Sequence, residues 1–157
     1  SPTQVVFDYG EANEPGSVHI QIVSRVIEGE YPNYQDVIPA GYKTKIRAQK
    51  ESFINHVKAA SVFAGKTNEV RLVIDGGKKG VEFLSQNSDA GQNRSTLEAE
   101  IVGDKGEAAF NWRFLQEGLS QLKGDVVELD LNGEEGPALL RSAEQEGYVY
   151  VIMPIKA

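Results

Sequence analysis

The sequence predicts an α+β domain made of two similar helix-plus-hairpin units, which we call the two repeats. Apolar residues recur at helical spacing in two segments, and segments that alternate in the manner of strands follow each of them. Residues 70–76 and 127–133 also place apolar residues and a glycine at the same offsets. One repeat cannot bury both its helix stripe and its sheet face, so the two should pack as a pseudo-symmetric pair. We therefore expect two helices side by side on one face of a continuous antiparallel sheet.

The N-terminal segment predicts a hairpin and a connector. Residues 3–9 and 17–27 have the composition of strands, and a loop rich in Gly, Asn and Pro joins them. Glycines and prolines are dense over residues 28–41, which predicts an extended connector. We expect three parts: residues 1–30 as the remnant of a preceding domain, 31–41 as the connector, and 42–157 as the main domain.

The first repeat begins with a strand over residues 42–49 and a helix over 50–64. Phe53, Val57, Ala60 and Ala64 form one face of this helix, and Gly65 is expected to end it. The following strands are expected at 70–75, 81–86 and 95–102, with a glycine-rich turn at 76–80 and a polar loop at 87–94.

The second repeat is expected to begin with residues 108–110 and a helix over 111–122. Asn111 is the predicted N-cap and Gly124 the predicted stop. Strands should follow at 126–131, 138–141 and 148–155. In this repeat Ser142 follows Val127 at the distance that separates Ser85 from Val70 in the first. The apolar face of the second helix is expected to consist of Phe114, Leu115, Gly118, Leu119 and Leu122.

Composition limits the possible functions. The formal charge of -7 argues against a protein that coats nucleic acid through excess positive charge, although residues 40–66 form a locally basic segment. The absence of cysteine excludes disulfides and thiolate sites. No apolar run approaches the length that crosses a bilayer, and the first residues lack the layout of a signal peptide. We therefore expect a cytoplasmic protein that does not bind membranes.

The residues suggest no enzyme mechanism. His19 and His56 lack a nearby carboxylate pattern that would orient them, so both are expected to be structural or exposed. Asp125, Glu128 and Asp130 alternate along a predicted strand and are expected to be surface acids rather than metal ligands. The glycine-rich turn precedes a strand and lacks the order of a phosphate-binding loop. We expect no catalytic residue, no metal and no cofactor.

Two motifs at opposite ends of the main domain carry a resemblance to a known family. Residues 28–39, with Tyr31-Pro32 and Ile38-Pro39, closely resemble the linker between the second and third domains of bacterial DNA polymerase sliding clamps, the beta subunits of DNA polymerase III. Residues 150–157, with Met153-Pro154, resemble the terminal strand of that family. Segments around Phe110-Asn111 and residues 136–140 are also similar, so the resemblance spans about residues 17–157.

The resemblance implies the DNA-clamp fold and a subunit of a head-to-tail homodimeric ring. Such a ring encircles duplex DNA without reading its sequence, in the bacterial cytoplasm at the nucleoid. The hole would be lined by the polar sides of the two helices, at Asn55, Lys58, Arg113, Gln116 and Lys123. The neighbouring subunit would contact Val62, Phe63 and an edge strand at residues 81–86, and residues 1–30 would be the last hairpin of the middle domain.

The family also carries a groove that binds short linear peptides of the replicative polymerase, the clamp loader and repair polymerases. Phe114 stands where a tyrosine is familiar, Asp36 where a base is common, and Ala157 in place of a larger apolar residue. These departures bear on peptide preference. Carried over by resemblance, the groove would include Pro32, Val37, Asn111, Phe114, Pro137, Val151, Met153, Pro154, Ile155 and Lys156.

The residues taken alone leave two other functions open. One is an α+β domain that binds or hydrolyses a small molecule in a cleft that the sequence does not reveal. The other is a protein-interaction module unrelated to DNA. A deep pocket with converging polar groups would favour the first of these.

Overall fold

The computed structural model describes residues 3–10, 19–75 and 79–156, and the chain divides into two compact units, Ser1–Asn33 and Tyr34–Ala157. The first unit contains an antiparallel hairpin of β1 (Gln4–Tyr9) and β2 (Ile20–Arg25), which confirms the predicted strand pair. Its register puts Phe7 opposite Ile22, and the two lie on one apolar face of the hairpin. Residues 1–2, 11–18, 76–78 and 157 lie outside the described residues. They include most of the loop predicted between the two strands, the start of the strand predicted at 17–27 and most of the turn predicted at 76–80.

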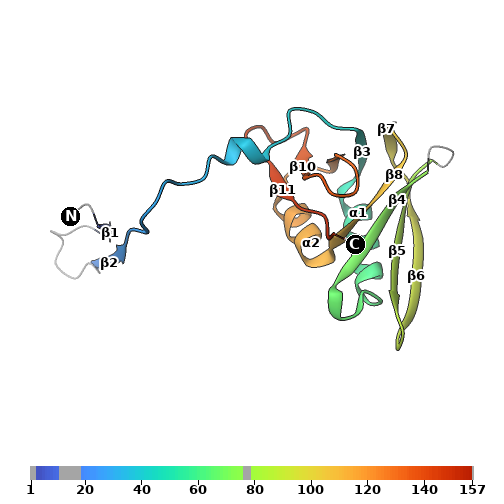
Figure 1. The fold of residues 1–157 in the computed structure, drawn as a ribbon, viewed down its shortest axis with the longest axis horizontal. Helices are drawn as coiled ribbons and strands as arrows, with labels where there is room; N and C mark the ends of the chain where they lie inside the picture. Colours follow the sequence, from blue (N-terminus) through green and yellow to red (C-terminus); the bar gives the residue numbers. More distant parts are fainter. Residues whose placement is uncertain (1–2, 11–18, 76–78, 157) are drawn as a thin grey trace. The chain divides into compact units, whose positions relative to one another are not determined.

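The second compact unit contains both repeats (Figure 1). It opens with a 3₁₀ helix, η1 (Tyr34–Val37), inside the stretch predicted to be extended. The first repeat comprises β3 (Thr44–Gln49), α1 (Lys50–Ser61), η2 (Gly65–Thr67), β4 (Glu69–Ile74), β5 (Val81–Asn87), β6 (Gly91–Leu97) and β7 (Glu100–Gly103). The second comprises β8 (Gly106–Asn111), α2 (Trp112–Gln121), β9 (Val126–Leu131), β10 (Ala138–Ser142) and β11 (Tyr150–Ile152).

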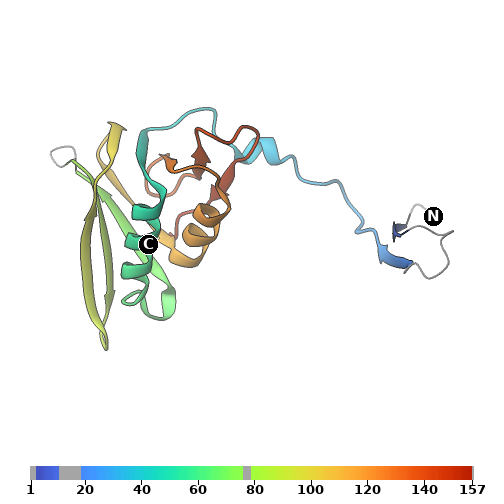
Figure 2. The same cartoon turned by 180° about the vertical axis from the view of Figure 1, so that it is seen from behind.

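The strands of this unit form two sheets, so the prediction of one continuous sheet is wrong in that detail. The described strands follow the orders β11-β10-β9-β3-β7 and β6-β5-β4-β8. The chain turns a corner at Glu98 and Ala99, where it leaves β6 and enters the other sheet as β7, so the predicted strand 95–102 is split between the sheets. In Figure 2 the green and yellow strands of the four-stranded sheet lie to one side of the paired helices. The α+β class with two adjacent helices is confirmed.

The predicted pseudo-symmetry takes the form of an exchange of leading strands. β3, which precedes α1, pairs with β9 of the second repeat, whereas β8, which precedes α2, pairs with β4 of the first. The registers are equivalent, because Val70 lies opposite Phe110 and Val127 lies opposite Ala48. Each sheet is thus completed by the other repeat, which explains why neither repeat is expected to be stable alone.

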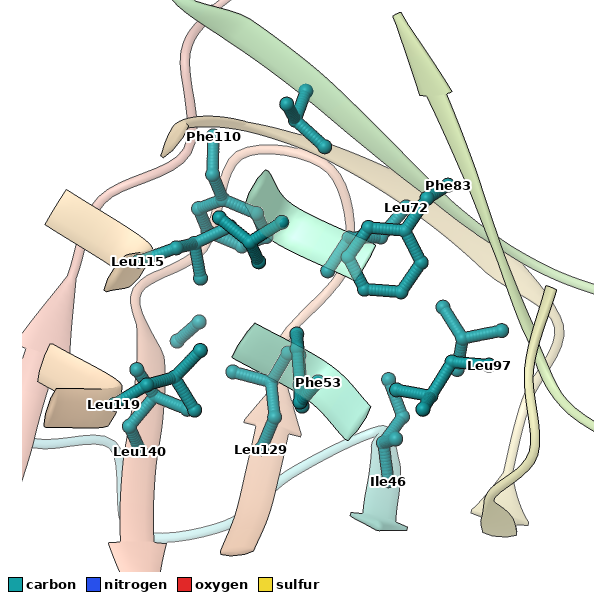
Figure 3. Close-up of a cluster of buried hydrophobic side chains, with 14 of the residues drawn as sticks. Ile46, Phe53, Leu72, Phe83, Leu97, Phe110, Leu115, Leu119, Leu129 and Leu140 are labelled. Carbon is teal, nitrogen blue, oxygen red and sulfur yellow. The ribbon is translucent and has the colours of Figure 1, made fainter. Parts of the chain in front are cut away.

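One hydrophobic core fills the space between the helices and the sheets (Figure 3). Phe53 of α1 contacts the ring of Phe83 of β5 edge-on, with ring centroids 5.4 Å apart. The equivalent positions of the two repeats, Leu72 and Leu129, are both fully buried. Ser85 is buried as well and donates a hydrogen bond of 2.7 Å to the carbonyl of Ala60, which ties β5 to the last turn of α1.

Several predicted boundaries differ from the structure. The helix predicted over 50–64 ends at Ser61, and Gly65 begins a 3₁₀ turn with a φ of 60°. The polar loop predicted at 87–94 is shorter, because β6 begins at Gly91 and pairs with β5. Polar residues predominate in β6, which made this edge strand look like a loop. Phe114, predicted in the apolar face of the second helix, is 51% exposed.

Candidate functional site

The C-terminal segment connects the two sheets. β11 pairs with β10, with Ile152 opposite Ala138, and the chain then crosses to the other sheet. There the backbone N–H of Ile155 donates a 2.7 Å hydrogen bond to the carbonyl of Ala109 on the edge strand β8. Pro154 is buried and Met153 is 54% exposed. The segment is therefore held in an extended form while it presents the Met153 side chain to solvent.

The N-terminus of α2 follows β8 directly. The side chain of Asn111 accepts a hydrogen bond of 3.0 Å from the backbone N–H of Arg113, so the predicted N-cap is confirmed. Trp112 anchors this end of the helix, because its backbone and indole N–H groups both donate to Asn68, at 2.9 and 3.2 Å. Phe114 lies two residues after Trp112, in the first turn of α2, and half of its surface is exposed.

The contact between α2 and β11 depends on Gly118. A Cβ built at this position would lie 2.6 Å from the ring of Tyr150 and 3.0 Å from Leu140. Only glycine therefore allows the strand to approach the helix this closely. Burial, and then the nearby Glu117 and Tyr148, raise the pKa of the Tyr150 phenol, which keeps it neutral. The sequence gives a signal for this contact, since Gly118 interrupts an otherwise apolar stripe.

Most of the predicted groove residues lie in the second compact unit, and several gather at the end of β11. Pro137 precedes the β10 residue that pairs with Ile152, so it lies at the same end of the hairpin as Met153. Val151 lies opposite Leu139 in the register. Val37, on η1, is 54% exposed, and Lys156 is also exposed. Pro32 belongs to the first compact unit and is exposed.

The predicted DNA-facing residues lie on the helices or just beyond them. Asn55 and Lys58 are exposed on α1, on the side opposite the buried stripe, and Arg113 is exposed on α2. Gln116 is half-buried on α2, and Lys123 is exposed just after it. The guanidinium of Arg113 lies 5.3 Å from the centre of the Trp112 ring, a cation–π contact. The two helices pack against each other, so these residues belong to neighbouring elements.

The predicted subunit-contact residues lie beside an edge strand, but it is not the strand that the sequence suggested. The segment 81–86 belongs to β5, which pairs with β4 and β6 and is therefore internal. The edge of this sheet is β6. Val62, 67% exposed, and Phe63 directly follow α1. A Cβ at Gly91, the first residue of β6, would lie 3.9 Å from the Phe63 ring, so these residues adjoin the exposed edge.

Two titratable residues, Asp130 and His19, have surroundings that differ from the prediction. Asp130, expected on the surface, is 2% exposed; its carboxylate bonds to Arg141 and lies 3.8 Å from Lys45. His19 does have a carboxylate partner, Asp8, at 3.4 Å. His56 hydrogen-bonds to Ser95 at 2.9 Å, and burial lowers its pKa.

These groups do not form a metal centre in the part of the chain that is described. Within residues 3–10, 19–75 and 79–156, no group of three or more His, Asp or Glu side chains is arranged to hold a metal ion. In the same part of the chain, no helix is both long and apolar enough to cross a bilayer.

Two repeats that exchange their leading strands around a pair of helices define a domain of the DNA-clamp type. The comparison with known families agrees. Residues 35–156 match the family described as DNA polymerase III beta subunit, C-terminal domain, and the chain belongs to this family.

Relatives and solved structures extend this likeness. The beta sliding clamp of Synechococcus elongatus is 28% identical over 154 residues, which cover 98% of this chain and 39% of that protein. The sliding clamp of Bacillus subtilis has 25% identity and a TM-score of 0.80, and the match covers 99% of this chain and 39% of that one. The sliding clamp of Bartonella birtlesii, solved with bound griselimycin, has 26% identity and a TM-score of 0.82 over 100% of this chain and 40% of its own. The chain thus spans about two fifths of the length of its relatives.

Proposed function

We propose that this chain is the C-terminal part of a sliding clamp subunit, which acts within a head-to-tail ring around duplex DNA as a processivity factor. The observation that carries the proposal is the DNA-clamp-type domain, with exposed basic residues on its paired helices and a free edge strand beside Val62 and Phe63. The ring would act in the bacterial cytoplasm, at the nucleoid. It would contact DNA through Asn55, Lys58, Arg113, Gln116 and Lys123, without reading sequence.

In this proposal the ring contact uses β6 rather than β5. An edge strand presents unpaired backbone groups, and pairing with a strand of the neighbouring subunit would satisfy them. Val62 and Phe63 would supply apolar contacts at one end of this edge. Residues 1–30 would complete a sheet of the middle domain, which would cover the apolar face around Phe7 and Ile22, and residues 31–41 would connect the domains.

The surface around Phe114 and Met153 would bind short extended peptides from the polymerase, the clamp loader and repair polymerases. Phe114 and Met153 are both about half exposed. Phe114 lies on α2, whose first turn is capped by Asn111, and Met153 lies in the C-terminal segment, which a hydrogen bond from Ile155 to Ala109 holds in place. Exposed apolar side chains on a rigid frame are typical of a docking surface. The Bartonella birtlesii relative was solved with griselimycin bound, which is consistent with a ligand surface in this family.

A peptide titration tests this assignment. The probe is a fluorescein-labelled extended peptide with adjacent leucine and phenylalanine anchors, titrated against the chain and its Phe114→Ala and Met153→Ala variants. Each truncation should weaken binding by roughly one decade, because the loss of one buried large apolar contact costs about 1.5–3 kcal/mol at full burial. Affinity for the complete clamp should be higher still, since the middle domain would add a second wall.

Val102→Ala is the matched control. Val102 is 62% exposed and lies on β7, at the opposite edge of the sheet from β11. This variant should bind the probe as the unchanged chain does. Peptide binding that survives both the Phe114 and the Met153 truncations would place the peptide site elsewhere.

A further inference from the structure

The internal repeat gives the C-terminal surface a counterpart in the first repeat. Ile152 pairs with Ala138 at the end of β10–β11, and Leu97 pairs with Val81 at the equivalent end of β5–β6. After Ile152 the chain crosses to β8, where Ile155 bonds to Ala109. After Leu97 the chain crosses in the same way to β3, where Glu100 lies opposite Arg47.

The strand registers show which residues of the first repeat occupy the same positions as residues of the second. Glu98 follows Leu97 as Met153 follows Ile152, and Glu100 takes the place of Ile155. Gln49, the N-cap residue of α1, takes the place of Asn111. The frame of the proposed peptide surface is thus repeated, but carboxylates stand where that surface has apolar side chains.

A cleft of about 600 Å³ lies in this second frame. Ala48, Ala99 and Val126 provide small apolar groups in its lining. Its charged groups are Arg47, Lys79, Glu98 and Glu100, and all four are exposed. Arg47 and Glu100 approach to 3.9 Å, a loose surface pair that costs little to separate.

We propose that this cleft is a second docking site for an extended peptide, one that takes two basic side chains against Glu98 and Glu100 and an acidic one against Lys79. Glu98 and Glu100 are two residues apart, so an extended ligand with basic residues at the same spacing would present them on one side. The proposal rests on the proposed function in so far as it treats the C-terminal surface as a peptide site. Its ligand differs, however, because it lacks apolar anchors.

The test is a titration of the ¹⁵N-labelled chain with a synthetic peptide of sequence Gly-Lys-Gly-Lys-Gly-Asp-Gly. The amide signals of Gln49, Ala99 and Val126 should shift, with a dissociation constant in the millimolar range that rises with salt, as expected for exposed ion pairs. A peptide of the same composition with adjacent lysines should bind more weakly. The double variant Glu98→Lys and Glu100→Lys should weaken binding roughly 3- to 30-fold, the effect of two surface pairs.

The matched control is Glu134→Lys with Glu135→Lys, which changes the net charge equally at two exposed acids outside the cleft. A milder variant, Glu98→Gln with Glu100→Gln, tests the site without introducing repulsion near Arg47. The proposal is overturned if the three amides do not shift, or if the control weakens binding as much as the cleft variants do. Either failure leaves the C-terminal surface untested, because Phe114→Ala and Met153→Ala report on that surface with a different probe.

Discussion

The alternation of residues along β9 predicts that Asp130 is exposed, but Asp130 is buried. Its position along β9 has the parity of an outward-facing residue, and it does lie on the face opposite the core. Arg141 and Lys45 from the two neighbouring strands nevertheless cover it. Burial raises the pKa of the Asp130 carboxyl, and the positive charges of Arg141 and Lys45 oppose that rise. The sequence holds both partners, but only the strand order brings them together.

Arg141→Met should therefore destabilise the domain more than Asp130→Asn. Arg141 is 37% exposed in its side chain, so it can be hydrated when Asp130 is neutralised, whereas removal of Arg141 leaves a buried carboxylate with one distant partner. We expect a loss of about 1–3 kcal/mol for Arg141→Met at neutral pH, measured by urea unfolding. This loss of stability should shrink as pH falls. The raised pKa favours protonation of Asp130 in the folded variant, and protonation removes the buried negative charge that has lost its partner.

The comparison with the unchanged chain at each pH isolates this effect. Measurements at neutral pH and at about pH 4.5 should give a larger deficit for Arg141→Met at the higher pH. An equal deficit at both values would mean that the guanidinium contributes packing rather than charge.

At the scale of elements, long periodic segments were predictable and polar strands were not. The helical spacing of Phe53 and Val57 located α1, and Asn111 located the start of α2. The sequence predicts part of β6 as a loop because this edge strand consists mainly of polar residues. The spacing predicts Phe114 in the apolar face of the second helix, yet α2 buries a narrower stripe of Leu115, Gly118 and Leu119. How wide a stripe is buried depends on what packs against it.

The exposed helix faces allow a test of the DNA-facing assignment. Lys58→Glu with Arg113→Glu, introduced into the complete clamp, should weaken its association with duplex DNA and reduce the steepness of its salt dependence. Each phosphate contact contributes about one unit to the slope of log K against log salt, so a change of roughly one to two is expected. Both side chains are exposed, and the fold should be unaffected.

Lys43→Glu with Lys105→Glu serves as the control for net charge. Both lysines are exposed and lie outside the two helical segments. This variant should leave the salt slope close to that of the unchanged clamp. If the helix variant and the control give the same slope, the helix faces do not carry the DNA contact.

At the scale of the whole molecule, the duplication was predictable but the exchange of strands was not. Equal offsets in residues 70–76 and 127–133 indicate two related repeats, whatever their arrangement. Whether β3 pairs within its own repeat or with β9 depends on which pairing buries both helix stripes against both sheets. The same exchange makes the two helices neighbours and leaves β6, β7, β8 and β11 as the edges of the two sheets among the described strands of the second compact unit.

The distribution of these edges leads to a prediction for assembly. In the proposed head-to-tail ring, the edge beside Val62 and Phe63 would join a different surface of the next subunit. This chain covers about two fifths of its relatives' length. The chain alone should therefore lack the second half of that contact. Light scattering at about 20 µM and 200 µM should give a mass near the monomer value of 17.2 kDa. Val62→Asp should leave this mass unchanged, while the same substitution in the complete subunit should weaken its dimer. A stable dimer of this chain that Val62→Asp dissociates would show that the β6 edge pairs with itself, and the head-to-tail contact proposed here would be wrong.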